Sequence, residues 1–403
     1  MTVQTTSNLS NSVRAQYVAD YLRGAGIARL YDQFASPVGG LSMEQAMQGS
    51  SIVIPVLFDL EPTEDTISQT ADVTPVVMTD TTVSITPTSR RNAIQWSQTL
   101  DIQAYTNYGA ERFYKLGQNQ MESIDLVAMN ACLAGSLVHR AAARASLDAG
   151  TSGHRLSDAD MEDVQGILAS LKVPAFVGEA GASAWAALMH PYPFHDLRES
   201  GNVDSVGLYQ NQGISLNWEL GKLGPFRLIV SADAKTLYGA GIARTAGELS
   251  ETLATAVSAG DTTTVLGSGT HVDDSIWLNF CDTVETTTTY YPKNEHARYV
   301  SGTTTGTITF IGTAPDGGLR FAHSTACTIN NADDVFPVVY GGPQSLAKAF
   351  VPSVGEFGEV IGPEEGGLLH QFTHIGWKWW GAYARVAENR ICRGEYTISF
   401  QSS

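Results

Sequence analysis

The segment NYGAERFYKLGQNQMESIDLVAMNACLAGSLVHRAAARA, residues 107–145, carries the strongest helical pattern in the chain. At ~1.5 Å per residue it predicts a helix roughly 55 Å long. A helix of that length is expected to serve as a backbone for the layers around it, and its alanine-rich second half would allow close packing. Its apolar side chains recur every three to five residues, as on one face of a helix: Leu116, Met121, Ile124, Val127, Ala131, Ala134, Val138 and Ala141.

The residues before this helix are predicted to be extended. Ile52–Leu60 is a strand-like apolar run, although it contains Pro55. Residues 61–100 are largely polar, and we expect Arg90-Arg91-Asn92 to separate two extended runs within them. The segment therefore predicts a long, polar, two-stranded excursion.

The residues after the helix predict a mixed α/β region. Ser157 is expected to cap a second helix that Pro174 ends, and Phe226–Val230 reads as a strand. Residues 247–336 differ sharply in composition, with 11 acidic residues against 3 basic ones and 19 threonines. Turn residues such as Ala259-Gly260-Asp261 punctuate them, so we predict an inserted, exposed β-rich module. A final β run is expected at Tyr396–Phe400.

Composition restricts the classes of protein to consider. The 403 residues are 43% apolar and 16% charged, which predicts two or three folded domains. The net charge of −17 offers no general attraction to nucleic acid or to an anionic membrane. No apolar run approaches the ~18 residues of a membrane span, and the first thirteen residues contain no Lys or Arg, so we expect neither a membrane segment nor a secretory signal.

Motifs for catalysis, metals or cofactors are weak throughout. The sequence contains no phosphate loop and no GxSxG elbow, and the four cysteines lie far apart without a CxxC, which predicts packed thiols rather than a zinc site or disulfides. His190 and His195 could suggest a metal site, but Pro191 and Pro193 prevent both histidines from lying on one face of a helix, so we expect a turn there. A short helix is expected near Asp196–Glu199. We predict no catalytic residue, no metal and no cofactor.

Two short motifs and the order of segments resemble a known family. WAALMHPYPFHDLR at residues 185–198 is similar to the His-Pro and Asp-Leu-Arg signature of its podovirus-type branch, and IGWKWWGAYARV at 375–386 is similar to a Gly-Trp-Lys segment near the end of that branch. The order of the predicted segments is also similar to that of the family: an arm, an extended hairpin, a long helix, an α/β domain and a return strand. The chain thus resembles the major capsid protein of tailed double-stranded DNA bacteriophages.

The resemblance implies an α+β fold of the Hong Kong 97 type. By analogy residues 1–50 form an N-terminal arm and 51–100 an extended loop that overlaps a neighbour, while 101–150 with 376–403 form a peripheral domain. Residues 151–375 would form an axial domain that contains the β-rich insertion at about 247–336. The family also implies self-assembly into hexamers and pentamers, so that the partner is the chain itself, in a virion capsid assembled in the host cytoplasm. Scaffolding, portal and decoration proteins are further partners that the resemblance suggests. Packaged double-stranded DNA would lie next to the shell without a specific binding site, and no membrane partner is expected.

Contacts between subunits would replace an active site. Charged and aromatic residues in the arm and the extended loop are the candidates: Arg14, Arg23, Glu61, Glu64, Asp65, Arg90, Arg91 and Trp96. Two alternatives remain at this point. One is a β-rich decoration or adhesin protein, and the other is a metal-dependent hydrolase that uses His190 and His195.

Overall fold

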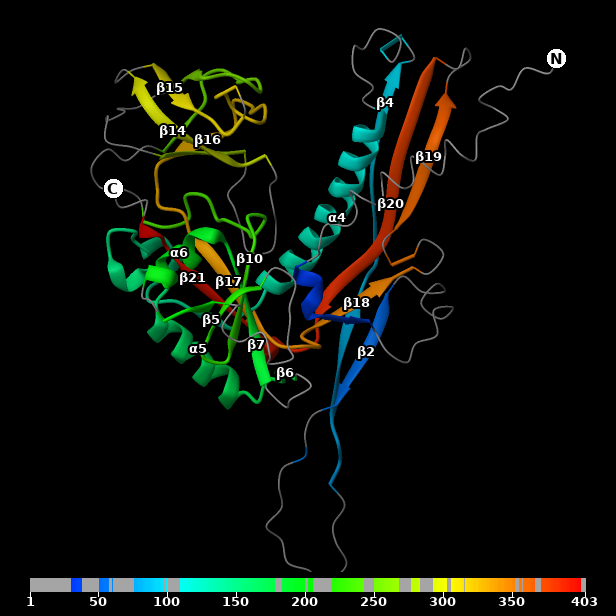
Figure 1. Ribbon diagram of the computed structural model, residues 1–403, viewed down its shortest axis with the longest axis vertical. Coiled ribbons are helices and arrows are strands. Elements are labelled where there is room, and N and C mark those ends of the chain that lie inside the picture. Colours follow the sequence, from blue (N-terminus) through cyan, green and yellow to red (C-terminus); the bar gives the residue numbers. More distant parts are fainter. Residues whose placement is uncertain are drawn as a thin grey trace, which may run out of the picture. The chain divides into compact units, whose positions relative to one another are not determined.

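The computed structural model divides into two compact units, Met1–Ala128 with Gln344–Val386, and Met129–Pro343 with Ala387–Ser403. No helix within the described residues is long and apolar enough to cross a membrane. The structure (Figure 1) describes residues 30–37, 51–57, 60, 76–97, 99–100, 109–177, 183–199, 202–205, 219–242, 250–267, 277–282, 293–302, 306–314, 316–351, 355–356, 358–366 and 371–399.

The boundaries of the units differ from those expected at 150/151 and 375/376. Residues 344–375 were expected in the axial domain, but strands β18 (Leu346–Phe350) and β19 (Glu359–Gly366) pair with β20 (Phe372–Arg385) in the first unit. Residues 387–403 were expected beside the long helix, but β21 (Ile391–Tyr396) pairs with β17 (Phe336–Gly341) in the second unit. Strand pairing between distant segments sets these boundaries.

The long helix α4 spans Gly109–Leu133 and is shorter than predicted. Leu116, Met121 and Ile124 are buried, as their spacing predicts. The helix stops because Gly135 follows it and because Arg393 satisfies its end, donating hydrogen bonds from Nη1 to the carbonyl oxygens of Leu133 and, at 2.9 Å, Gly135. Beyond this point the predicted helical residues form the short strand β5 (Val138–His139) and a 3-10 turn at Arg144–Ser146.

A five-stranded sheet forms the core of the first unit. The strand β4 (Thr88–Ser97) runs antiparallel to β20 along its whole length, β20 also pairs with β18 and β19, and β1 (Ala35–Pro37) pairs with β18 (Figure 1). Trp377 and Trp379 of β20 are buried whereas Trp380 is exposed, as the alternation of a strand requires. The prediction that Arg90-Arg91-Asn92 separates two extended runs is wrong, because these residues lie within β4. The two strands are separated earlier, at Thr86-Pro87, between the end of β3 at Ile85 and the start of β4 at Thr88.

An antiparallel pair is present, but its strands differ from those predicted within residues 61–100: β2 (Ile52–Leu57), from the preceding apolar run, pairs with β3 (Asp80–Ile85), and β4 pairs with β20 instead. Ile52 and Ile85 pack with Ala347 and Ala349 in a small apolar cluster of the first unit. Pro55, opposite Thr82, has no amide hydrogen to donate to the neighbouring strand, which an edge strand tolerates better than a central one.

A seven-stranded path forms the central sheet of the second unit, in the order β5-β21-β17-β7-β10-β9-β8, with β6 beside β7. Ser157 caps α5 (Asp158–Ser170) in a capping box with Asp160, and β10 spans Phe226–Val230, as predicted. The expected turn after His190 is instead the first turn of α6 (Pro191–Glu199), because proline is well suited to the first helical position. The remaining strands are β6 (Phe176–Val177), β7 (Ser183–Met189), β8 (Asp204–Ser205) and β9 (Glu219–Leu223).

Three arginines surround Glu395 of β21 inside the second unit, and the Glu395 carboxylate is fully buried. Arg393 and Arg140 donate to it at 2.9 and 3.0 Å, and Arg144 contacts both of its oxygens. Burial acts to raise the pKa of Glu395, but the hydrogen bonds and charge of Arg144, together with Arg393 and Arg140, outweigh it and hold that pKa below its ordinary value.

A six-stranded antiparallel sheet occupies residues 250–330, in the order β11-β16-β13-β14-β15-β12, and is called the β module below. Its core is separate from that of the central sheet and contains Phe280, Phe310 and Ile329. Gly260 and Gly317 have φ of +91° and +84°, which explains the glycines at the predicted turns. Its strands are β11 (Ser250–Thr252), β12 (Thr263–Val265), β13 (Trp277–Cys281), β14 (Glu295–Gly302), β15 (Thr307–Ile311) and β16 (Thr328–Asn330).

Candidate assembly interface

The strand β2, with the sequence IVIPVL, is apolar on both faces, but the described part of the chain covers only one of them. Ile52 and Ile54 face the apolar cluster that includes Ala347 and Ala349. Val53 and Leu57 point the other way and are 49% and 63% exposed. A strand with apolar residues on both faces is typical of one that is covered on both sides, so the outer face of β2 lacks such a cover among the described residues.

The exposed apolar surface continues on the segment that leads into β3. Val76 and Val77 are 75% and 83% exposed, and Met78 is half exposed. We call the exposed side chains of this two-stranded region the hairpin patch: Val53, Leu57, Leu60, Val76, Val77 and Met78. The sequence analysis missed it because residues 61–100 are polar on average, although the consecutive apolar residues at 76–78 are a readable signal.

The predicted contact residues fall into two groups. Arg14, Arg23, Glu61, Glu64 and Asp65 lie outside the described residues. Arg90, Arg91 and Trp96 lie on β4.

The two described arginines are exposed and Trp96 is partly buried. Arg90 and Arg91 are adjacent in the strand and therefore point to opposite faces. Among the described residues neither guanidinium lies within ion-pair distance of a carboxylate. Trp96 already has a partner in the chain, because the guanidinium carbon of Arg112 lies 4.7 Å from the centre of its ring.

Residues 30–37, which lie within the predicted arm (1–50), are fastened to α4 and to the sheet. Asp125 of α4 accepts a hydrogen bond from the backbone amide of Tyr31 at 2.9 Å. Burial raises the pKa of Asp125 to about 7, against the lowering effect of the backbone amides at Tyr31, Leu30 and Asp32. Lys348 lies 3.0 Å from Asp32 and 2.6 Å from Glu356, so an ion-pair network holds the same segment from the β18 side.

The two histidines of the hydrolase hypothesis have separate surroundings. The ring of His190 packs against Tyr192 and Phe336, and burial, followed by the nearby His296, lowers its pKa to about 4. His195 is half exposed beside Asp196 and Glu199 on α6. The groups that could hold a metal in the described part of the chain do not include His190, so the pair forms no common site.

Comparison with known proteins identifies the fold through structure alone. No family model matches the sequence, and no curated protein matches it. The chain is similar to the solved structure "Capsid of Ralstonia phage GP4", with a TM-score of 0.54 and 10% sequence identity over 87% of this chain and 84% of that one. It is also similar to "Capsid structure of the Cyanophage P-SCSP1u", with a TM-score of 0.48 and 9% identity over 92% and 88% of the two chains.

A third similar structure is "The head structure of Helicobacter pylori bacteriophage KHP40", with a TM-score of 0.47, 11% identity and coverage of 91% and 88%. The Ralstonia phage GP4 capsid, which matches 87% of this chain, defines the fold. The mixed sheets, the long helix and the paired strands described above agree with it. The chain therefore has the α+β capsid fold of the Hong Kong 97 type, which the order of its segments predicted.

Proposed function

We propose that the chain is a major capsid protein that self-assembles into the icosahedral shell enclosing the genome of a tailed bacteriophage. The observation that carries this proposal is the pairing of a capsid fold with a strand, β2, that is apolar on both faces and covered on one. A shell protein needs surfaces that only a neighbouring copy completes, and the fold supports a structural role rather than an enzymatic one.

The occupant of the hairpin patch is a second copy of this chain. Full burial of one Val, Leu or Met side chain contributes about 1.5–3 kcal/mol, whereas an exposed ion pair contributes about 0–1 kcal/mol. Six apolar side chains therefore outweigh the charged contacts in the free energy of assembly. The ion pairs serve to select the register between copies.

The charged candidates remain part of the proposal. Arg90 and Arg91 are exposed on β4, and in this proposal they pair with acidic residues of a neighbour. Glu61, Glu64 and Asp65 in the loop, and Arg14 and Arg23 in the arm, would provide the complementary charges. The role of Trp96 is then to support β4 through its contact with Arg112.

The same proposal extends to assembly and location. The copies would form hexamers and pentamers in the virion capsid, after assembly in the host cytoplasm. Scaffolding, portal and decoration proteins are the further partners. Packaged DNA would lie near a surface whose chain carries a net charge of −17, which limits adhesion of the genome to the wall.

The test replaces Val76, Val77 and Met78 together by serine. Expressed wild-type protein should form shells that sediment rapidly and are visible by electron microscopy, while the triple variant should remain as slowly sedimenting subunits with an unchanged melting temperature. A matched control replaces Val300 and Ile311, which are 52% and 54% exposed on the β module, by serine and should still assemble. Normal shells from the triple variant would contradict the proposed interface.

A further inference from the structure

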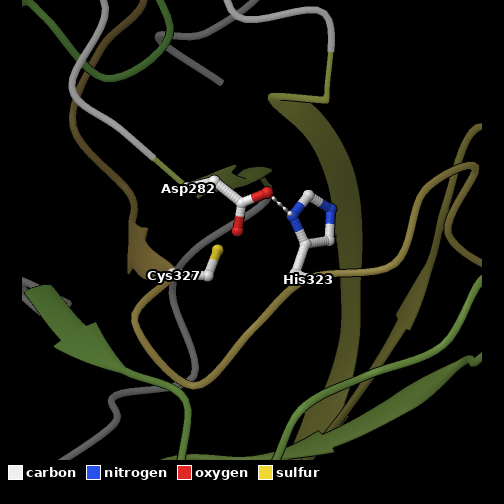
Figure 2. Close-up of side chains that lie close together, drawn as sticks. All are labelled: Asp282, His323 and Cys327. Carbon is white, nitrogen blue, oxygen red and sulfur yellow. Dashed lines mark ion pairs between the residues drawn. The ribbon is translucent and has the colours of Figure 1, made fainter.

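Three potential metal ligands from separate segments converge inside the β module. Asp282 directly follows β13, His323 pairs with Val257 in an isolated bridge, and Cys327 directly precedes β16. Figure 2 shows the Asp282 carboxylate and the His323 ring facing each other, with the sulfur of Cys327 beside them. One ligand atom from each residue lies within 4.8 Å of the other two.

The separation of the first two ligand atoms matches a tetrahedral zinc site. The Nδ1 atom of His323 lies 3.3 Å from Oδ2 of Asp282. Zinc bonds of about 2.0–2.1 Å to nitrogen and oxygen place two ligands of a tetrahedron roughly 3.3 Å apart. Cysteine, histidine and aspartate together are also a donor set suited to zinc, with borderline and soft donors combined.

The hydrogen bond between His323 and Glu295 decides which ring nitrogen of His323 is available to bind a metal. Nε2 of His323 lies 3.1 Å from Oε1 of Glu295, which is buried at the start of β14. The Glu295 carboxylate also accepts from the amides of Arg320 and Phe321 at 2.9 Å, and from the hydroxyl of Thr313 at 3.0 Å. Glu295 is thus an acceptor that places the ring proton on Nε2 and leaves the lone pair of Nδ1 directed at Asp282. A carboxylate behind a histidine is a frequent outer partner in metal sites.

Two buried atoms at the centre of the cluster make no hydrogen bond: Oδ1 of Asp282, and Nδ1 of His323, whose polar neighbour is Oδ2 of Asp282 at 3.3 Å. The His323 side chain is fully buried. Buried polar atoms left without partners carry a free-energy cost, which a cation bound between them would remove. The Asp282 side chain is 25% exposed, so solvent reaches this ligand and a water would serve as the fourth one.

We propose that Asp282, His323 and Cys327 bind one Zn²⁺ ion that stabilises the β module. The ion would link the end of β13 to the turn before β16, two strands that are neighbours in the sheet. Binding converts the Cys327 thiol to a thiolate and releases its proton to solvent, so the two anionic ligands balance the charge of the ion. This inference is independent of shell formation, and it departs from the expectation that the cysteines are packed thiols only.

The first test uses the full-length chain, with Co²⁺ as a spectroscopic probe and elemental analysis for Zn²⁺. We expect one equivalent of metal per chain and a sulfur-to-cobalt charge-transfer band. Cys327→Ser should abolish that band, whereas Cys392→Ser, which removes an equally buried thiol outside the β module, should retain it. Glu295→Gln should weaken binding by about 10- to 100-fold.

A second measurement needs no variant and so does not depend on the folding of one. Thermal unfolding of the wild-type chain should occur at a higher temperature with stoichiometric Zn²⁺ than with a chelator. Two results would overturn the proposal. One is no bound metal and no thermal shift, which would indicate an imidazolium that bridges Asp282 and Glu295. The other is cobalt bound without a charge-transfer band, which would place the ion at the exposed His195, Asp196 and Glu199.

Discussion

Trp377 of β20 donates a hydrogen bond from Nε1 to Oδ1 of Asn119 on α4, at 3.3 Å. The same oxygen accepts from Nδ2 of Asn92 at 2.9 Å, and Asn92 is the residue directly opposite Trp377 in the pairing of β4 with β20. One amide on the helix thus contacts both members of a cross-strand pair. This contact fixes the position of α4 along the two strands of the first unit.

Asn119→Ala should destabilise the first unit by about 1–3 kcal/mol, because the buried Trp377 donor is left without its acceptor. Urea unfolding followed by tryptophan fluorescence measures the change. Gln118→Ala, the neighbouring and similarly half-buried position on α4, is the control and should have a smaller effect. Equal effects of the two changes would show that the hydrogen bonds contribute little.

Asp125→Asn should stabilise the first unit at pH 7. The pKa of Asp125 is raised from 3.8 to about 7, so the carboxyl keeps its proton in the folded state while the unfolded chain ionises. The wild type therefore loses stability as pH rises from about 4 to about 7, and the amide, which still accepts from Tyr31, removes that loss. Melting temperatures across this range check the prediction, with the exposed Glu162→Gln as a control that should leave the pH slope unchanged.

Glu395→Gln should destabilise the second unit at neutral pH by about 3–5 kcal/mol, because it leaves three arginines around a neutral group. The wild-type pKa is lowered from 4.5, so its contribution is present above that pH and is lost as pH falls through the folded value. The variant should accordingly lose this acid dependence. Glu359→Gln breaks a half-exposed pair with Lys378 and should cost only about 0–1 kcal/mol.

Removal of the β module should leave shell formation intact, provided the chain is a capsid protein. Ser250 and Asn330 are opposite each other in the pairing of β11 with β16, so a short Gly/Ser linker can join the two ends. The module has its own apolar core, so its folding does not depend on the core of the central sheet, although its removal also deletes the contact of His296 with Tyr238. Particles seen by electron microscopy would agree, whereas a variant that folds but never assembles would show the module to be essential.

Mature particles should release a single band near 43 kDa after boiling in detergent and reductant. Some shells of this fold are locked by isopeptide bonds from a lysine of the extended loop, but this chain has no lysine before Lys115. Arginine does not form that bond, and Lys235 and Lys348 are buried. A ladder of multimers would contradict assembly by non-covalent contacts alone.

Local chemistry made part of this fold predictable. The Ser157 cap, the β10 strand and the burial of Leu116, Met121 and Ile124 on α4 depend on neighbouring residues, and the structure confirms them. Later members of the predicted face differ, since Val127 and Ala131 are only partly buried and Ala134, just beyond the helix, is exposed. The end of α4 was missed because it depends on Arg393, 260 positions after Leu133. The place of Arg90 and Arg91 within β4 was missed because pairing with β20 outweighs their polarity.

The candidate sites likewise divide into those chosen from the sequence and those seen only in the structure. The charged contacts were chosen from sequence and remain proposals, whereas the hairpin patch emerged only when β2 was seen to be covered on one face. Two of the proposed zinc ligands, His323 and Cys327, are only four residues apart, a spacing that the sequence analysis did not consider. The third, Asp282, is brought to them by the pairing of β13 with β16, which spacing along the chain does not reveal.

The strand order of the central sheet has a consequence for biosynthesis. The strand β21 lies between β5 and β17, so these two cannot join one sheet until residues 391–396 have left the ribosome. The sheet is therefore completed late, after the β2–β3 hairpin and its apolar surface have already been made. A nascent chain would need protection from aggregation in this interval, and each polyribosome would hold many incomplete subunits that are not yet able to assemble.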